Sequence, residues 1–102
     1  MTGVELIAAE RKRQVEKEGW TQEHDASHTD MTLAVAGAAY ALDIAGFYSG
    51  ECDSWRQIYC ANAAKVWPFD LEWFKSTHDD PVRQLVKAGA LIAAEIDRIK
   101  AT

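Results

Sequence analysis

The sequence predicts an all-α protein, a small bundle of about four helices with an irregular aromatic segment before the last helix. Three observations support this fold class. Apolar residues recur at helical spacing in long segments, no segment alternates apolar and polar residues as a half-buried strand does, and helix-ending Gly and Pro residues separate the segments. A chain of 102 residues with 48% apolar residues is typical of one compact domain, residues 1–102.

The first helix is expected over Val4–Glu18, with a narrow apolar side and an otherwise charged surface. Gly19 can end it, because glycine adopts the left-handed conformation without steric cost. Helical spacing places Glu10, Arg13, Gln14 and Lys17 on one side. Such a mixed face is usually solvated, although it could also hold phosphate through its basic residues.

The second helix is expected over Met31–Tyr48, with Thr29 or Asp30 as N-cap and Ser49-Gly50 after its end. It is apolar nearly all round, which predicts the central buried helix. Small residues on one side allow a neighbouring helix to approach within roughly 8 Å. These residues are Ala34, Gly37, Ala38, Ala41 and Ala45.

The third helix is expected over Asp53–Val66, and Trp67-Pro68 then breaks it because the residue before proline avoids the α region. One side of this helix carries Trp55, Ile58, Tyr59, Ala63 and Val66. The following segment, up to Phe74, is irregular and rich in aromatic residues. It could pack as a lid over the bundle.

The fourth helix has the clearest signals. Asp80 is in the N-cap position, Pro81 is at the first helical position, and the helix continues to about Lys100. Its apolar residues follow the i, i+3, i+4, i+7 spacing of an amphipathic helix. They are Val82, Leu85, Val86, Gly89, Ile92, Ala93, Ile96 and Ile99.

The charge balance limits the classes of partner. A net charge of −5 and a pI near 5.1 disfavour general binding to nucleic acids or anionic membranes, which need a basic surface. No signal-like N-terminus and no apolar run long enough to span a bilayer is present, so a cytoplasmic location is expected. Cys52 and Cys60 match no zinc or disulfide pattern; on one helix they would lie roughly 12 Å apart, too far for a disulfide.

The connection after the first helix is the best candidate for a site, because it concentrates Trp20, His24, Asp25 and His28. The His-Asp-x-x-His spacing could bind a divalent metal, since imidazole and carboxylate are both good ligands. The histidines could instead donate hydrogen bonds to a polar ligand. A third interpretation is a capping loop before the second helix.

Two further sets of residues could bind a phosphorylated ring compound. Arg83 and Lys87 lie one turn apart at the start of the fourth helix, where the helix dipole also favours anions. Trp20 and Trp73 occur in polar, irregular contexts, and an indole ring can stack on a base or a sugar. Surface charge and core packing are the alternative roles for these residues.

Several motifs occur together in the chain: Glu10-Arg11-x-Arg13-Gln14, Lys17-Glu18-Gly19-Trp20-Thr21, Glu23-His24-Asp25 with His28, and Arg83-x-Leu85-Val86-Lys87-Ala88-Gly89-Ala90-Leu91-Ile92. Together they resemble a group of small helical proteins common in phage and prophage genomes. This resemblance covers nearly the whole chain and implies a bacterial or phage cytoplasmic origin, but no particular reaction.

The chain is more loosely similar to the all-α nucleoside triphosphate pyrophosphohydrolases of the MazG type. That resemblance implies an oligomer that holds magnesium with a Glu-x-x-Glu pair and a later Glu-x-x-Asp pair. The chain lacks the first pair and has Gln84 and Lys87 where the second is expected. Glu10, Glu18 and Asp25 would be the magnesium ligands of a divergent member.

Three functions follow from these observations. The first is a phage-type accessory protein that sequesters a nucleotide-like, phosphate-bearing small molecule without a cofactor. The second is a divergent magnesium-dependent pyrophosphohydrolase, and the third is an interaction module that inhibits a host protein. Short helical chains often pair to bury more surface, so a homo-oligomer is expected. The predicted ligand-binding residues are Arg13, Trp20, His24, Asp25, His28, Trp73, Arg83 and Lys87.

Overall fold

A computed structural model describes residues 1–48 and 53–101, with backbone only for residues 22 and 53–56. Ser49, Gly50, Cys52 and the side chain of Trp55 lie outside the described residues. Within these ranges the chain forms α-helices and one 3-10 turn, and no strand, so the all-α prediction is confirmed. The elements are α1 (Gly3–Lys17), α2 (Gln22–Asp25), α3 (Thr32–Phe47), α4 (Asp53–Val66), η1 (Leu71–Trp73) and α5 (Pro81–Lys100).

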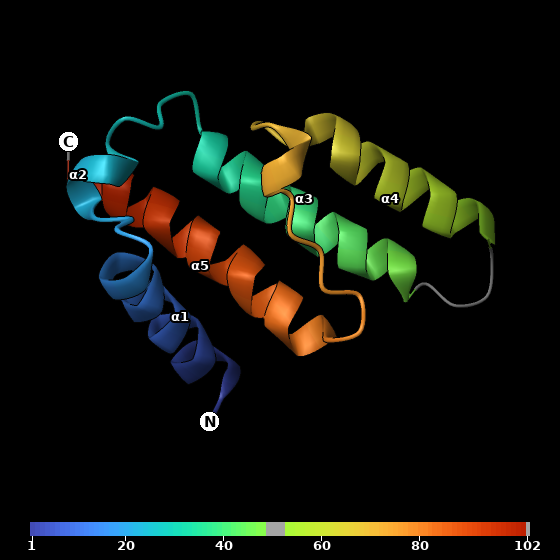
Figure 1. Cartoon of the computed structure of the whole chain (residues 1–102), viewed down its shortest axis with the longest axis horizontal. Coiled ribbons are helices and arrows are strands. Elements are labelled where there is room, and N and C mark those ends of the chain that lie inside the picture. Colours follow the sequence, from blue (N-terminus) through green and yellow to red (C-terminus); the bar gives the residue numbers. More distant parts are fainter. Residues whose placement is uncertain (49–52, 102) are drawn as a thin grey trace.

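The long helices lie side by side in one layer (Figure 1). α3 packs against α4 on one side and α5 on the other, and α1 packs against the far side of α5. The molecule measures 42 × 32 × 22 Å, as expected for a layer one helix thick with additional chain on one face. That additional chain is the connection between α4 and α5, which crosses in front of α3. No helix in the described part of the chain is long and apolar enough to cross a membrane.

The helix ends follow local sequence signals with one exception. The N–H of Arg83 donates to the Asp80 side chain at 3.0 Å, which confirms the predicted cap of α5. Gly19 follows α1 with φ of +73°. The predicted Thr29 or Asp30 cap of α3 is wrong: Met31 is the N-cap and its own side chain makes no capping hydrogen bond. The Ala34 N–H of the first turn donates instead to Glu95 of α5 at 2.9 Å. The chain enters α3 through left-handed backbone at Asp30 and Met31, a turn that sequence patterns do not reveal.

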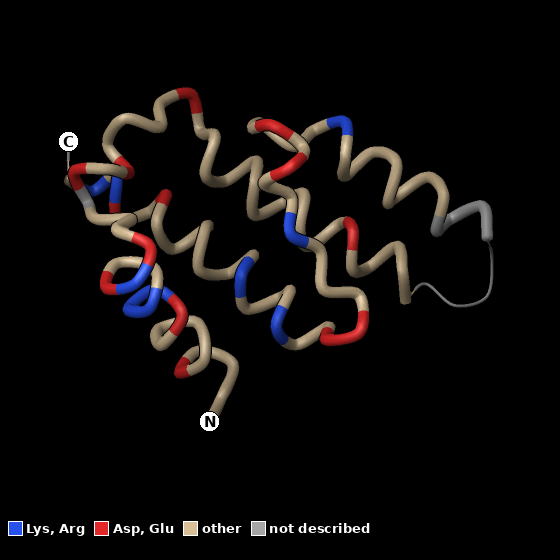
Figure 2. Tube along the Cα trace, in the orientation of Figure 1, with Lys and Arg blue, Asp and Glu red and all other residues tan. Residues whose placement is uncertain are grey.

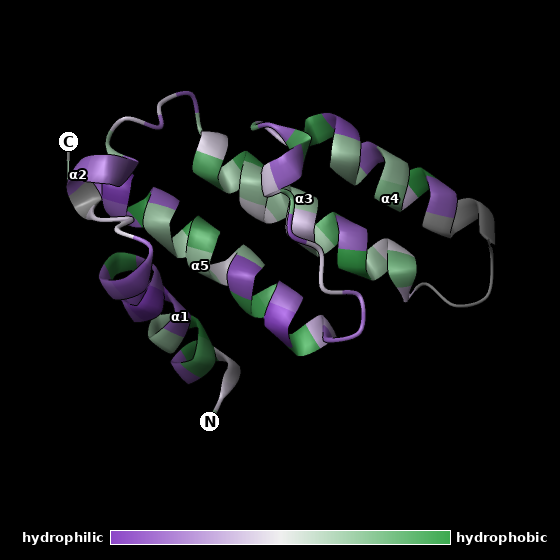
Figure 3. Ribbon diagram, in the orientation of Figure 1, coloured by the Kyte–Doolittle hydropathy of each residue, from purple (hydrophilic) through white to green (hydrophobic). Residues whose placement is uncertain are grey.

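The apolar core lies between α3 and α5, so the prediction of a central buried helix is confirmed. It consists of Leu33, Ala36, Tyr40, Ala88, Leu91 and Ala94. Trp67, Phe69 and Phe74 of the connection pack against it. A Cβ added to Gly37 would lie 2.9 Å from the carbonyl oxygen of Ala88, so glycine is required for α3 and α5 to approach this closely. Figure 3 shows α3 as pale to green over most of its length.

The burial of one side of α1 and of one side of α5 differs from what the spacing of their apolar residues predicts. The side of α1 that would usually be solvated is buried at Glu10 and Gln14, because arginines on α1 and α5 supply hydrogen bonds to Glu10. Conversely, much of the apolar stripe of α5 remains exposed, at Val82, Leu85, Ile92, Ile96 and Ile99. The reason is that α3 and α1 flank α5 at its small residues, such as Ala88, Ala90 and Ala94, which are buried instead.

Candidate functional site

A cavity of about 890 Å³ lies between α1, α5 and the aromatic connection. Every residue predicted above to bind a ligand lines it, as do Glu10 and Glu18. Sequence reasoning did not assign Gln14, Leu33, Tyr40, Trp67, Phe69, Asp70, Lys75 or Leu91 to the site, yet these residues line the cavity too. A signal for Tyr40 was present, because it is the one aromatic residue within the alanine-rich residues 34–45.

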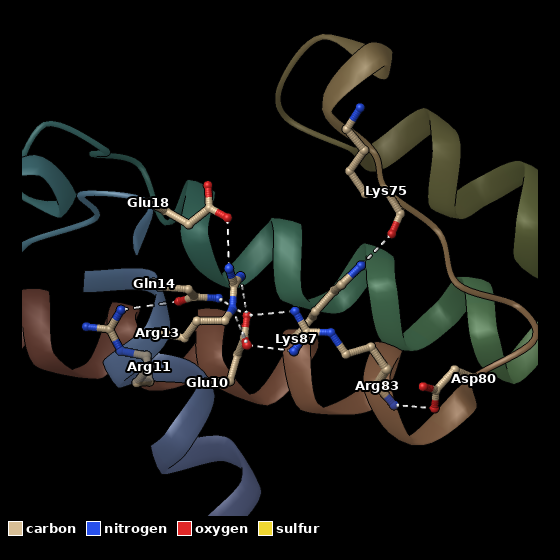
Figure 4. Close-up of polar contacts among 9 residues, drawn as sticks. All are labelled: Glu10, Arg11, Arg13, Gln14, Glu18, Lys75, Asp80, Arg83 and Lys87. Atoms are coloured by element: carbon tan, nitrogen blue, oxygen red, sulfur yellow. Dashed lines mark hydrogen bonds and ion pairs between the residues drawn. The ribbon is translucent and has the colours of Figure 1, made fainter. Parts of the chain in front are cut away.

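Glu10 is the centre of an ion-pair cluster at the floor of the cavity (Figure 4). Arg13 Nε donates to Glu10 Oε1 at 2.8 Å, and Arg83 Nη1 donates to the same oxygen at 2.6 Å. Gln14 Nε2 donates to Glu10 Oε2 at 3.2 Å, and a second arm of Arg13 reaches Glu18 at 2.9 Å. One buried carboxylate therefore positions guanidinium groups from two different helices.

The same cluster fixes the protonation state of Glu10. Burial alone would raise the pKa of this carboxyl, but hydrogen bonds from Arg13 and Arg83 outweigh it and lower the pKa to about 2. The pKa of Arg13 is raised, chiefly by its hydrogen bonds to Glu10 and Glu18. Glu10 and Arg13 are therefore both ionised at neutral pH, and their charges largely cancel.

Lys87 differs from the arginines. Its side chain is half-buried, and its Nζ donates to the carbonyl oxygen of Lys75 at 2.7 Å and lies 5.4 Å from the centroid of the Tyr40 ring. Among the described residues no carboxylate lies within ion-pair distance of it. Burial, followed by the nearby charge of Arg83, lowers the pKa of Lys87. A bound anion would supply the counter-charge that this half-buried ammonium group lacks.

Basic side chains face the cavity from two directions. Figure 2 shows Lys and Arg on α5 and on the connection in front of α3, and both signs of charge along α1. Lys75 of the connection is exposed, and its Nζ lies 5.8 Å from the centroid of the Trp73 ring. The Lys75 N–H donates to the Tyr40 hydroxyl at 3.0 Å, which ties the connection to α3.

The opposite wall of the cavity is a chain of rings in contact. Trp20 stacks on His24 at 6.5 Å between centroids, His24 meets His28 at 5.0 Å, and His28 meets Phe69 at 5.3 Å. Phe69 in turn contacts Trp67 at 5.5 Å. The short helix α2, which no sequence pattern indicated, turns the chain so that these rings align. Such a wall offers planar apolar surface together with imidazole donors.

Asp25 is buried behind this wall. Its Oδ1 lies 3.4 Å from His24 Nδ1, and its Oδ2 lies 3.6 Å from a guanidinium nitrogen of Arg11. Each of the three predicted magnesium ligands, Glu10, Glu18 and Asp25, thus has an arginine partner. Among the described residues, no three His, Cys, Asp or Glu side chains are grouped to hold a metal ion. A magnesium ion at these carboxylates would have to replace existing ion pairs.

A buried polar network anchors the connection behind the cavity. Asp43 of α3 accepts a hydrogen bond from Ser76 at 3.0 Å and contacts His78 Nε2 at 2.6 Å. Gln84 of α5 donates to the same Asp43 oxygen at 2.8 Å and accepts from the Thr77 N–H at 2.6 Å. The residues before α5 are therefore fixed to both α3 and α5, which holds Trp73 and Lys75 at the rim.

Comparisons of the chain with protein-family models, with curated proteins and with solved structures found no match. The resemblances described above therefore stay predictions. Any conclusion about function depends on the cavity and its residues.

Proposed function

We propose that this chain binds and sequesters a nucleotide-like small molecule that carries phosphate. The observation that carries the proposal is the half-buried ammonium group of Lys87, which has no carboxylate partner within the described residues and faces the same cavity as the ring wall. A phosphate group supplies the anion that Lys87 lacks, and a base or sugar supplies a planar group for the rings. A cavity of about 890 Å³ is within the usual size for a ligand of this kind.

The cationic side of the cavity supports the phosphate assignment. Arg13 and Arg83 are positioned by Glu10, so their remaining N–H groups are directed without a further cost in side-chain entropy. Because Glu10 and Glu18 already balance much of this charge, the cavity favours a ligand with few negative charges over a free triphosphate.

Sequestration is favoured over hydrolysis because of the carboxylates. Magnesium-dependent phosphoryl chemistry needs free oxygen ligands, and Glu10, Glu18 and Asp25 are each paired with arginine. A nucleotide-binding protein of this kind would act in the cytoplasm, where such ligands are found.

The first test is incubation of the purified protein with mixed cellular nucleotides and magnesium, followed by mass spectrometry. Recovery of an intact nucleotide on heating the protein supports sequestration. Accumulation of monophosphate and pyrophosphate in solution supports the divergent hydrolase instead. If neither occurs, the proposal fails, and the interaction module anchored by residues 67–74 becomes the leading function.

A matched pair of lysine variants locates the phosphate. Lys87→Gln is expected to weaken binding of the recovered nucleotide roughly 10- to 100-fold, the effect of losing one charge-assisted hydrogen bond. Lys12→Gln removes the same charge from the outer surface of α1, where the Lys12 side chain is 74% exposed, and is expected to leave affinity unchanged. Equal affinities of the two variants, measured by titration calorimetry, would contradict the assignment.

A further inference from the structure

The face of the layer opposite the cavity carries an exposed apolar row on α5. Leu85, Ile92, Ile96 and Ile99 are between 44 and 53% exposed. At 100° per residue these side chains point roughly 120–180° around the helix from Lys87, which lines the cavity. The row is roughly 21 Å long, the rise of fourteen helical residues. An exposed apolar row of this length is unusual for a monomer.

A row of small residues on α3 lies next to it. Ala34, Ala38 and Ala45 are half-buried or exposed and point away from Tyr40, which lines the cavity. The two rows are adjacent, because a Cβ added to Gly37 of α3 would lie 3.0 Å from Ile92 Cγ1 of α5. The back of the molecule therefore presents a ridge of large aliphatic side chains on α5 beside a groove lined by alanines on α3.

The residues that define this back face, the α3 row and the α5 row, are uncharged, and the exposed Lys100 lies at its C-terminal edge, roughly 40° around α5 from Ile96. Asp43, the one charged residue of α3, is buried on the other side with His78 and Gln84. On α5, Glu95 is buried and accepts from the Ala34 N–H and from Arg98, and Asp97 pairs with Arg11. Both helices are described along their whole length, so the face is apolar along the full extent of the two rows.

The overall dimensions indicate how much surface is left uncovered. A monomer of 11.4 kDa is expected to expose ~5,800 Å², whereas this chain exposes 6425 Å². Its radius of gyration is 13.8 Å, against ~12.8 Å for a compact domain of this length. This excess of ~600 Å² belongs to the whole flat molecule, and a standard interface that buries ~800 Å² per partner would more than offset it.

We propose that a second copy of this chain covers the back face. A two-fold axis parallel to the helices and midway between α3 and α5 places α5 of each copy over α3 of the other. The aliphatic ridge on α5 of one copy then packs into the alanine-lined groove on α3 of its partner, and the same contact is made twice. The product is a four-helix core of two α3 and two α5 helices, with one cavity on each outer face.

The test is sedimentation equilibrium of the full chain at micromolar concentrations. Wild type is expected at twice the monomer mass of 11.4 kDa. The double variant Leu85→Lys/Ile96→Lys places two charges in the interface of each copy and is expected to raise the dimer dissociation constant at least ~100-fold. Its helical circular dichroism is expected to match wild type, because both side chains are about half exposed in the monomer.

Two further variants keep the test decisive. Leu71→Lys is the matched control: Leu71 is 64% exposed on η1, in the connection that crosses the cavity face of α3, and the variant is expected to remain dimeric. Ala38→Arg introduces charge on α3 alone and serves if the double variant does not fold. The proposal is overturned by a monomeric wild type, including one that binds lipid vesicles, or by folded variants of the back face that stay dimeric.

Discussion

Replacing Glu10 by Gln tests whether this one buried carboxylate stabilises the cavity floor. Glu10 is 4% exposed and accepts hydrogen bonds from Arg13, Arg83 and Gln14. The amide introduced by Glu10→Gln would keep the shape of the side chain but lose its charge, and the new NH₂ group would face guanidinium donors. We expect the folded state to lose most of the stabilisation that the ion pairs provide.

The size of the effect follows from the pKa. A carboxyl whose pKa falls from 4.5 to about 2 on folding contributes ~3 kcal/mol at neutral pH. Solvent screens part of this, because the side chains of Arg13 and Arg83 are 39% and 35% exposed, so we expect a loss of ~2 kcal/mol. Since the folded pKa is lowered, this stabilisation is complete above pH 4.5 and is lost as the pH falls toward 2.

Urea denaturation at pH 6 and pH 3 measures the stabilisation that the Glu10 ion pairs provide and its dependence on pH. The difference in free energy of unfolding between wild type and Glu10→Gln is expected to be ~2 kcal/mol at pH 6 and below half of that at pH 3. Glu16→Gln is the control: Glu16 is exposed and meets Lys12 only at 4.0 Å, so a change below ~0.5 kcal/mol is expected. A Glu10→Gln variant as stable as wild type at pH 6, or a difference independent of pH, would refute the reasoning.

Three more predictions concern packing, the connection and pH. Gly37→Ala is expected to destabilise the chain by ~1–3 kcal/mol in urea denaturation, because its Cβ meets the Ala88 carbonyl at 2.9 Å; a neutral substitution would show that the helices can separate. Asp43→Ala is expected to lower the free energy of unfolding by ~2–4 kcal/mol, because it leaves the buried donors around His78 unpaired. It is also expected to speed amide hydrogen exchange in the connection, and unchanged exchange would contradict the anchoring role. Affinity for a phosphorylated ligand is expected to fall as the pH rises toward the ordinary pKa of lysine, because the pKa of Lys87 is lowered and its charge is lost earlier than usual; Lys87→Gln should show no such fall in calorimetry.

The residues of the site were easier to predict than their arrangement. Trp20, His24 and His28 stood out because a short connection rarely contains so many rings, and they do lie on one wall of the cavity. The sequence could not reveal that Glu10 faces Arg83, because these residues are seventy-three positions apart and meet only when α1 packs on α5. The same holds for Lys87 and the carbonyl of Lys75, which come together because the connection folds back over α3.

Periodicity also failed to decide which face of α5 is buried. The aliphatic stripe has the strongest apolar pattern in the chain, yet Leu85 and Ile96 remain about half exposed while Gln84 is fully buried. The physical reason is that the helices that pack against α5, rather than its own apolar pattern, decide which of its side chains are buried. α3 approaches α5 closely at Ala88 and α1 approaches it closely at Gly89. Gln84 is accommodated because Tyr40, Asp43 and Thr77 satisfy its amide.

The sequence by itself determined the all-α class, the bounds of the long helices to within about two residues, and the end of α1 and the cap of α5. These features depend on local chemistry: helical spacing, a capping carboxylate, and glycine or proline at a break. Only the tertiary structure decided the order α4–α3–α5–α1, the cavity that unites α1 with α5, and the uncovered back face. Those features depend on contacts between residues far apart in the sequence. Such a contact stabilises the structure only after the chain has folded and brought both residues together.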